Sequence, residues 1–296
     1  MSDAAPAARV TPSVSEFTAV VLDSVVNTPH TKTLRLDLGA PAGYRAGHYV
    51  TIDPHQFAEL RSIVGSLEQV KRRREAPRAY SLSSAPDEPC IAITVKEEVF
   101  DPGDTPFPPL LSGFLVHEVR AGDALTLRGF VGTYTLTDEA AAETDHVLHL
   151  CAGSGSVANL SILKDSLRRH PHISHTFVYS NRTWQDVIFR SELRAIRQCW
   201  GERVQVIHRL TRENGPLPGE ADVACGRIDF DLLRTILAAH PTSRVFVCGP
   251  GVSVRERRAA AAQGTTPPPP RFMETMLGYL DALAIPRAHI KVEAYG

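Results

Sequence analysis

Arg78-Ala79-Tyr80-Ser81-Leu82-Ser83-Ser84 places a cation, an aromatic ring and three serines within seven residues, on a run flanked by prolines. If the run is a strand, Arg78 and Tyr80 share one face and Ser81 lies on the other. A flavin nucleotide fits this pattern, because a guanidinium binds phosphates bidentately, a phenol ring lies against a flat heterocycle and a hydroxyl bonds its edge. The alternative is an edge strand with a core tyrosine and solvated Ser and Arg side chains.

Length and composition indicate a globular protein of two domains. At 296 residues the chain is long for one core, and 43% hydrophobic with 22% charged residues excludes a disordered or fibrous chain. With a net charge of -1, the protein as a whole has no electrostatic attraction for nucleic acid or for a membrane surface, so any basic binding site must be local. Residues 1–14 lack the apolar core of a signal peptide, and no apolar run is long enough to cross a bilayer. We therefore expect a flexible N-terminus at 1–14 and a cytoplasmic protein.

Cysteines and histidines give no pattern typical of a metal site. The five cysteines are scattered without a C-x-x-C pair, which argues against zinc or iron-sulfur sites and suits a reducing cytosol. His170, His172 and His175 invite a metal interpretation, but their polar loop lacks a supporting cysteine or carboxylate. No metal site is predicted.

Residues 15–138 predict an antiparallel β-barrel, because short β-branched runs alternate with turns. Its expected strands, besides the one at 78–84, are 17–26, 31–38, 49–52, 91–96, 125–130 and 133–136. Apolar residues recur at helical spacing in 57–77, a segment that contains the basic run 71–74. This run is interpreted as the solvated end of a surface helix or, alternatively, as a docking patch for an acidic electron carrier.

Residues 145–296, reached through a linker at 137–145, predict a parallel-sheet α/β domain. Short apolar strands alternate with helices, which is typical of a sheet covered on both faces, with ligands at the carboxyl ends of its strands. The expected strands are 147–151, 176–179, 204–208, 244–248 and 290–292. The basic and proline-rich stretch 255–271 is expected to be a solvated loop and a stiff connector.

Two stretches after strands of this domain suit a dinucleotide. Gly153-Ser154-Gly155-Ser156 follows the first strand and precedes a helix, so its small residues let a phosphate approach the backbone at the helix N-terminus. The alternative is a turn that serves packing alone. Asn181-Arg182 ends the second strand, where an NAD site usually has a carboxylate, whereas Arg182 suits a 2'-phosphate. NADPH is therefore preferred over NADH.

In order and spacing, these stretches resemble the ferredoxin-NADP reductase family over most of residues 15–296. The run at 78–84 matches the Arg-x-Tyr-Ser-x-x-Ser flavin motif, and residues 153–156 resemble the pyrophosphate loop. Val247-Cys248-Gly249-Pro250 matches the Cys-Gly-Pro phrase, whose cysteine lies near the nicotinamide. The resemblance implies an N-terminal FAD-binding barrel and a C-terminal NADP-binding α/β domain, with 57–77 and 255–271 as insertions.

The resemblance also implies roles for single residues. Ser81, Cys248 and Tyr295 are the implied catalytic residues, and Tyr295 covers the flavin face opposite Tyr80, so that nicotinamide must displace it. Ser112 starts a short helix whose free N-H groups can hold the flavin pyrophosphate, or it simply caps that helix. The full set of implied cofactor-binding residues is Arg78, Ala79, Tyr80, Ser81, Val95, Lys96, Leu111, Ser112, Gly153, Ser154, Gly155, Ser156, Asn181, Arg182, Cys248, Gly249, Pro250 and Tyr295.

The function implied is an NADPH-dependent, FAD-containing reductase of the oxygenase-reductase type. Because the chain stops at Gly296, without the fused iron-sulfur domain of some family members, the acceptor is expected to be a separate ferredoxin or flavodoxin that serves an oxygenase. Its docking site is expected on the basic segments 71–74 and 255–258. Alternatives are a free-flavin or oxygen reductase and a non-catalytic flavin-binding electron-transfer subunit. FAD is chosen over FMN from the resemblance.

Overall fold

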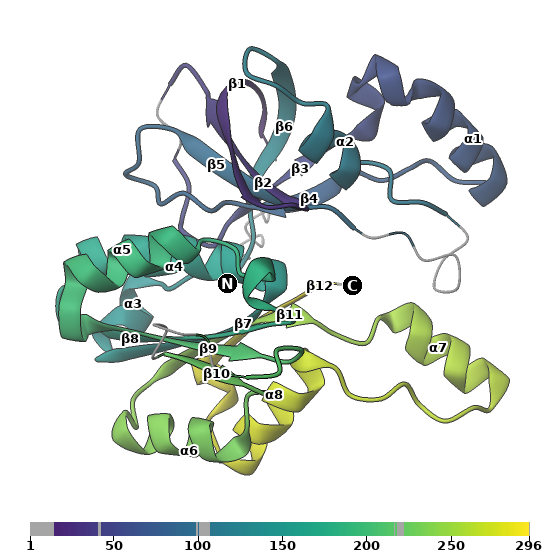
Figure 1. Ribbon diagram of the computed structural model, residues 1–296. Helices are drawn as coiled ribbons and strands as arrows, with labels where there is room; N and C mark the ends of the chain where they lie inside the picture. The colour runs from purple at the N-terminus through teal and green to yellow at the C-terminus, as the bar shows by residue number, and fades with distance from the viewer. Residues whose placement is uncertain are drawn as a thin grey trace, which may run out of the picture.

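The computed structural model describes residues 15–40, 43–98, 100, 107–215, 217 and 222–295. Its strands form two six-stranded sheets, the first antiparallel and the second parallel. Figure 1 shows the antiparallel sheet and its helices above the parallel sheet. The predicted fold class, a β-barrel followed by a parallel α/β domain, is confirmed. The flexible N-terminus expected at 1–14 lies outside the described residues.

The first sheet has the order β4-β3-β6-β1-β2-β5. Its strands are β1 (Ser15–Thr28), β2 (Thr31–Asp37), β3 (Tyr49–Ile52), β4 (Arg78–Ser81), β5 (Ile91–Lys96) and β6 (Ala124–Val131). The two ends of this order meet, because Leu82 bridges Ile93 and the Ser83 N-H donates to the Ala92 carbonyl at 2.8 Å. The sheet therefore closes into a barrel just beyond the Arg78–Ser81 strand.

The barrel is filled from alternate positions of its strands. Along β6, Leu125 and Leu127 are fully buried, whereas Ala124 and Arg128 are exposed. Two helices lie beside it, α1 (Arg61–Lys71) and α2 (Ser112–His117). Within α1, Val64 and Leu67 are buried while Ile63 and Val70 are exposed, so only part of the apolar spacing at 57–77 faces the barrel.

The segment that follows the barrel, residues 133–145, has a different secondary structure from the one predicted. Residues 133–136 are irregular, so the strand predicted there is wrong. Tyr134 instead turns away from the barrel and is buried against Phe246, with ring centroids 5.2 Å apart in an edge-on contact. The linker at 137–145 contains a short helix, α3 (Asp138–Ala142), whose first turn is capped by the Thr137 hydroxyl.

The second sheet has the order β10-β9-β8-β7-β11-β12 and all its strands are parallel. Its strands are β7 (His146–Ala152), β8 (Ser174–Asn181), β9 (Val204–Leu210), β10 (Val223–Cys225), β11 (Arg244–Pro250) and β12 (Ile290–Tyr295). Its main helices are α4 (Ser156–Arg169), α5 (Arg190–Trp200), α6 (Phe230–Ala239) and α8 (Phe272–Ala282). Helices α4 and α5 cover one face and α6 and α8 the other (Figure 1). The order along the sheet reverses between β7 and β11, and a crevice at the carboxyl ends of these strands is where such sheets bind ligands.

A further helix, α7 (Val254–Gln263), occupies part of the stretch predicted as a solvated loop. A capping box fixes its start, because the Ser253 hydroxyl accepts from the Glu256 N-H and the Glu256 carboxylate accepts from the Ser253 N-H. Gly264, with a φ of +61°, ends it. Helix α7 buries none of its residues and projects from the same side of the molecule as α1 (Figure 1).

Helix α4 holds the two domains together. The Ser161 hydroxyl donates to the Ser84 carbonyl at 2.6 Å, and the Lys164 ammonium pairs with Glu88 at 2.8 Å. Both barrel residues follow the Arg78–Ser81 strand directly, so the barrel is anchored to α4 beside the flavin motif. Among the described residues, no helix has the length and apolar character needed to span a membrane.

Candidate functional site

A cavity of about 360 Å³ opens beside β4 and contains most of the residues predicted to bind a flavin. Arg78, Ala79, Tyr80, Leu111 and Ser112 all line it. Sequence reasoning had not placed its other lining residues in a cofactor site, and these are Lys71, Arg73, Glu98, Phe107, Pro108, Pro109, Leu110 and Arg255. The cavity wall is therefore rich in cations, which suits a ligand with phosphate groups.

Arg78 is held in position by a buried acid. Its guanidinium bonds Glu75 Oε2 at 2.9 Å and the Ala76 carbonyl at 2.5 Å. The Glu75 carboxylate is 3% exposed and also accepts from the Lys71 ammonium at 2.6 Å. Burial opposes ionisation of Glu75, but the bonds from Lys71 and Arg78 outweigh it and lower the pKa of this carboxyl.

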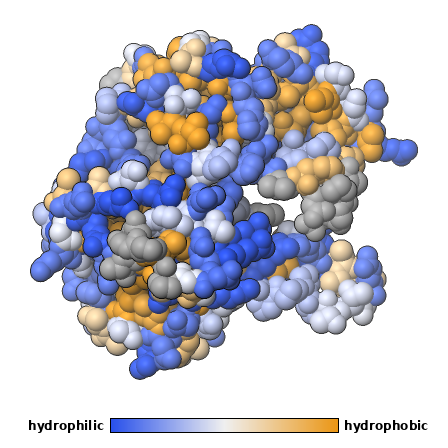
Figure 2. Space-filling model, viewed as in Figure 1, coloured by the Kyte–Doolittle hydropathy of each residue, from blue (hydrophilic) through white to orange (hydrophobic). Residues whose placement is uncertain are grey.

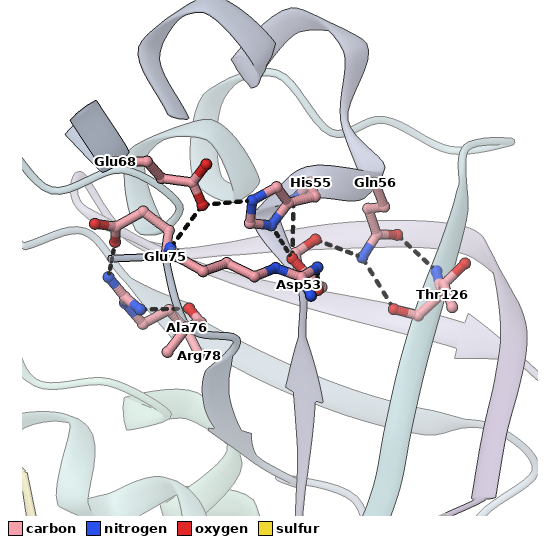
Figure 3. A network of polar contacts seen from close by, with 9 residues as sticks. Asp53, His55, Gln56, Glu68, Glu75, Ala76, Arg78 and Thr126 are labelled. Carbon is pink, nitrogen blue, oxygen red and sulfur yellow. Dashed lines mark hydrogen bonds and ion pairs between the residues drawn. The ribbon is translucent and has the colours of Figure 1, made fainter. Parts of the chain in front are cut away.

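The helical insertion reaches this pair through a chain of polar contacts. Figure 3 shows His55 between two carboxylates, with Nδ1 at 2.5 Å from Asp53 and Nε2 at 2.8 Å from Glu68. The same Glu68 oxygen accepts from the Glu75 N-H at 2.8 Å. Glu68 of helix α1 thus fixes the backbone of Glu75. The Glu75 carboxylate in turn fixes the guanidinium of Arg78.

Ser81 lies on the other side of β4 and meets the second domain. Its hydroxyl donates to Glu293 Oε1, on β12, at 3.0 Å. Burial raises the pKa of the Glu293 carboxyl, and the bond from Ser81 opposes this only in part. Sequence reasoning missed Glu293 as a site residue. A signal existed, because Glu293 stands two positions before Tyr295 and residues two apart share a face of a strand.

Cys248 lies at the end of β11, close to this contact. It is 3% exposed, and burial followed by the charge of Glu293 raises the pKa of its thiol well above the usual value. A neutral thiol is a weak nucleophile. The neighbouring Gly249 leaves no room for a side chain, since a Cβ there would lie 2.4 Å from the Phe272 ring.

The Gly153–Ser156 turn lies between the ends of β7 and β11. A Cβ on Gly155 would lie 2.1 Å from the Cys248 carbonyl oxygen, so only glycine lets the turn approach β11 this closely. The Ser156 hydroxyl is buried and bonded to Tyr179 at 2.9 Å, which leaves it unavailable to a ligand. The Tyr295 hydroxyl donates to the Ala152 carbonyl at 2.5 Å and covers the turn.

The end of β8 offers unpaired polar atoms beside two arginines. Asn181 is 6% exposed, and neither its amide oxygen nor its amide nitrogen has a partner in the described part of the chain. Buried polar atoms are normally paired, so this amide is suited to a ligand. The Arg182 carbonyl accepts from the Arg212 N-H at 2.8 Å, which brings two exposed arginines to one edge of the sheet.

Lys96 connects the barrel with this edge. Its ammonium lies 3.9 Å from the Cβ position of Gly153. Burial lowers the pKa of Lys96, with Asp186 opposing the shift and Arg182 adding to it, so the lysine stands between the turn and the end of β8. The turn, Lys96 and Arg182 therefore form a second group of cations and backbone donors, separate from the residues that line the cavity.

Other predicted site residues lie elsewhere. Val95 is 1% exposed and its side chain packs in the barrel core, away from the cavity lining. Pro250 pairs with Tyr295 at the end of β12. Of the three histidines considered for a metal, His175 is buried beside His149, whereas His172 bonds the Ala141 carbonyl. The described residues contain no group of three potential metal ligands.

The chain is similar in sequence to several known oxidoreductases. Residues 150–255 match the family model described as the oxidoreductase NAD-binding domain. The chain is similar to the 3-ketosteroid-9-alpha-monooxygenase ferredoxin reductase component of Rhodococcus rhodochrous, at 29% identity over 82% of this chain and 55% of the relative. It is also similar to the NADH oxidoreductase HCR of Escherichia coli, at 30% identity over 66% of this chain and 53% of the relative. The chain thus spans about half the length of these curated relatives.

Solved structures share the whole fold. The FAD/NAD-binding domain of a nitric oxide dioxygenase from Vibrio cholerae aligns with a TM-score of 0.69 at 22% identity, covering 95% of this chain and 98% of that one. Ferredoxin-NADP+ reductase from Plasmodium falciparum, solved with 2'P-AMP, aligns with a TM-score of 0.65 at 14% identity, covering 95% of this chain and 96% of that one. Together with the order of its motifs, these matches show that the chain shares the two-domain fold of these solved FAD- and nucleotide-binding proteins and is similar to ferredoxin reductase components.

Proposed function

We propose that the protein is an NADPH-dependent reductase that uses FAD to pass electrons to a separate ferredoxin or flavodoxin. The observation that carries this proposal is the contact between Ser81 of the flavin motif and Glu293 of β12. It joins the cationic cavity of the barrel to the crevice between β7 and β11. Two ligands bound in these places would meet at the domain boundary, as transfer between them requires.

The residues present fit a flavin dinucleotide. The cavity combines Arg78, a donor for phosphate, with the ring of Tyr80 and the hydroxyl of Ser112. When bound, the flavin supplies the chemistry of accepting an electron pair from a reduced nicotinamide and releasing electrons singly. The protein supplies orientation, because Glu75 fixes Arg78 before any ligand arrives.

We assign the following tasks to the residues at the boundary. The Ser81 hydroxyl and the Glu293 carboxyl form a short path on which a proton can be held, since burial makes the Glu293 oxygen more basic than usual. Cys248 packs as a neutral thiol. Tyr295 covers the Gly153–Ser156 turn and has to move for a nicotinamide to enter.

Two observations support a separate ferredoxin or flavodoxin as the electron acceptor. The relatives include ferredoxin reductase components of an oxygenase, and the chain carries basic segments at 71–74 and 255–258. Arg74 pairs with Asp53 and Arg257 with Glu274, whereas Arg72 and Arg258 are exposed, without an ion pair among the described residues. These exposed cations are the part of the basic segments that we propose for an acidic carrier.

The function is tested with the purified full chain. We expect a yellow protein whose released chromophore has the mass of FAD and whose colour bleaches on addition of NADPH under nitrogen. Cytochrome c should be reduced rapidly only when a ferredoxin or flavodoxin is added. A colourless protein that takes up no flavin contradicts the proposal. Fast oxygen consumption without a carrier would identify a free-flavin or oxygen reductase.

Replacing Arg182 with alanine should raise KM for NADPH about tenfold, because a charge-assisted bond to the 2'-phosphate is lost. KM for NADH should stay nearly unchanged, since that nucleotide lacks the phosphate. Steady-state kinetics with both nucleotides measure the difference. Arg234→Ala, on the exposed side of α6 and paired with Asp231, serves as the matched control. Equal losses with both nucleotides would remove the assignment of Arg182.

A further inference from the structure

We infer that the two insertions clamp the diphosphate of the flavin dinucleotide from both domains, with Arg73 and Arg255 as phosphate ligands in addition to Arg78. This inference rests on the proposed function, because it concerns the same cofactor. It adds a binding role for residues outside the flavin motif and a reason for selecting FAD over FMN.

The geometry brings these two arginines to one cavity from different domains. Arg73 follows the end of α1 in the barrel domain, and Arg255 lies in the first turn of α7 in the α/β domain. Both line the cavity that Arg78 and Tyr80 also line. Figure 2 shows an open notch on the side of the molecule from which α1 and α7 project. The cavity is therefore walled by both projections.

The charges of the cavity favour a dianion. Among the described residues, its lining includes four cations, Lys71, Arg73, Arg78 and Arg255, and one acid, Glu98. Lys71 is already committed to Glu75, which it bonds at 2.6 Å. Arg73 and Arg255 have no ion pair within the described part of the chain. Two unpaired guanidinium groups facing one cavity match the two negative charges of a diphosphate.

Both arginines lie on segments whose position is fixed. Arg72 has a φ of +51° and ends α1, which turns the chain toward the cavity at the next residue. The capping box of Ser253 and Glu256 fixes the first turn of α7. Glu256 also pairs with Arg271, at 2.5 Å, before α8. Arg255 is thus presented from a tethered helix turn.

A diphosphate explains this placement better than an acidic carrier protein does. A docking surface needs charge spread over a face, whereas these two side chains line one half-open cavity of about 360 Å³ together with Arg78. FMN carries one phosphate and lacks the second phosphate and the adenosine. Binding by Arg73 and Arg255 should therefore distinguish FAD from FMN, in contrast to Arg78, which serves both.

The test measures flavin affinity of the full chain after removal of its flavin, by titration with FAD and with FMN and detection of flavin fluorescence quenching. We expect Kd for FAD to rise about tenfold in Arg73→Ala and in Arg255→Ala, and about a hundredfold in the double variant. Kd for FMN should change less than about threefold in these variants. Arg255→Lys should restore part of the FAD affinity.

Arg258→Ala is the matched control, because Arg258 is an exposed arginine one turn further along α7 that does not line the cavity. Its Kd for FAD should equal that of the wild type. Unchanged FAD affinity in the double variant, or equal losses for FAD and FMN, overturns the inference. A wild-type protein that binds neither flavin overturns the proposed function itself. Circular dichroism of each flavin-free variant excludes misfolding as the cause of a loss.

Discussion

Gly155→Ala should abolish NADPH binding while the barrel keeps its flavin. The added Cβ would lie 2.1 Å from the oxygen and 2.5 Å from the carbon of the Cys248 carbonyl, and both are backbone atoms that cannot rotate away. The turn must then withdraw from β11, which opens the crevice between β7 and β11 where the nucleotide is proposed to bind. Overpacking of this kind costs about 3 kcal/mol, and because the turn must return to its original position to bind the nucleotide, this cost opposes binding and corresponds to a loss in affinity of more than a hundredfold.

The measurement is the rate of flavin bleaching by NADPH under nitrogen, together with the flavin content of the purified variant. We expect a rate at least a hundredfold lower at limiting NADPH and an unchanged flavin content. Gly278→Ala is the matched control in the same domain, because Gly278 lies within α8 and a Cβ there meets nothing within 4 Å. That variant should be neutral or slightly more stable. Normal bleaching by Gly155→Ala would contradict the proposed nucleotide site.

The sequence predicts the parallel domain well because its strands are continuous apolar runs. β7 and β11 are almost wholly buried, and strands buried on both faces appear in the sequence as short, continuous apolar runs that can be recognised locally. The Gly153–Ser156 turn is also predictable, since it needs only a strand before it and a helix after it. β10 was missed, because a three-residue edge strand has too few residues to form a pattern.

Other errors come from contacts between distant parts of the chain. Residues 133–136 have a strand-like composition, but Tyr134 packs against Phe246 of the other domain, a contact that no local pattern contains. Helix α7 was predictable, because Ser253 and Glu256 have the spacing of a capping box, yet the nearby prolines favoured a loop. The sequence groups 71–74 with 255–258 only as a docking site, and it was not predictable that Arg73 and Arg255 line one cavity with Arg78, because this depends on how the two domains pack.

The second large effect expected is acid unfolding of the parallel domain. His146, His149, His175 and His208 are all buried on strands β7, β8 and β9. Burial lowers the pKa of His146 to about 3 and those of His149 and His208 to about 4. Burial also places the pKa of His175 well below the usual value. Their neutral rings are bonded where partners exist, as in the contact of His146 with Ser243 at 2.8 Å.

The sign of the effect follows from proton uptake. An unfolded histidine has a pKa of about 6.5, so below that pH the unfolded chain binds protons that the folded domain excludes. Stability is therefore full above about pH 6.5 and falls as the pH is lowered toward the folded values. Each histidine contributes a slope of up to about 1.4 kcal/mol per pH unit. His55 in the barrel changes the stability in the opposite direction, because its bonds to Asp53 and Glu68 raise its pKa and stabilise the protonated ring in the folded state.

Four such histidines together can lower the free energy of unfolding by about 5 kcal/mol between pH 6.5 and 5, which equals the total stability of many domains. Urea unfolding at pH 7.5, 6.5 and 5.5, followed separately by fluorescence and by flavin release, measures the loss. His146→Gln keeps a polar side chain for Ser243 and Thr176 and should reduce the slope by about one quarter. A free energy of unfolding that stays constant from pH 7.5 to 5.5 would mean that these rings do not remain neutral in the folded sheet. Carboxylates such as Glu75, whose pKa is lowered by its partners, lose their contribution only at more acidic pH, whereas Glu293 and Asp165, whose pKa values burial raises, act in the opposite direction to the histidines.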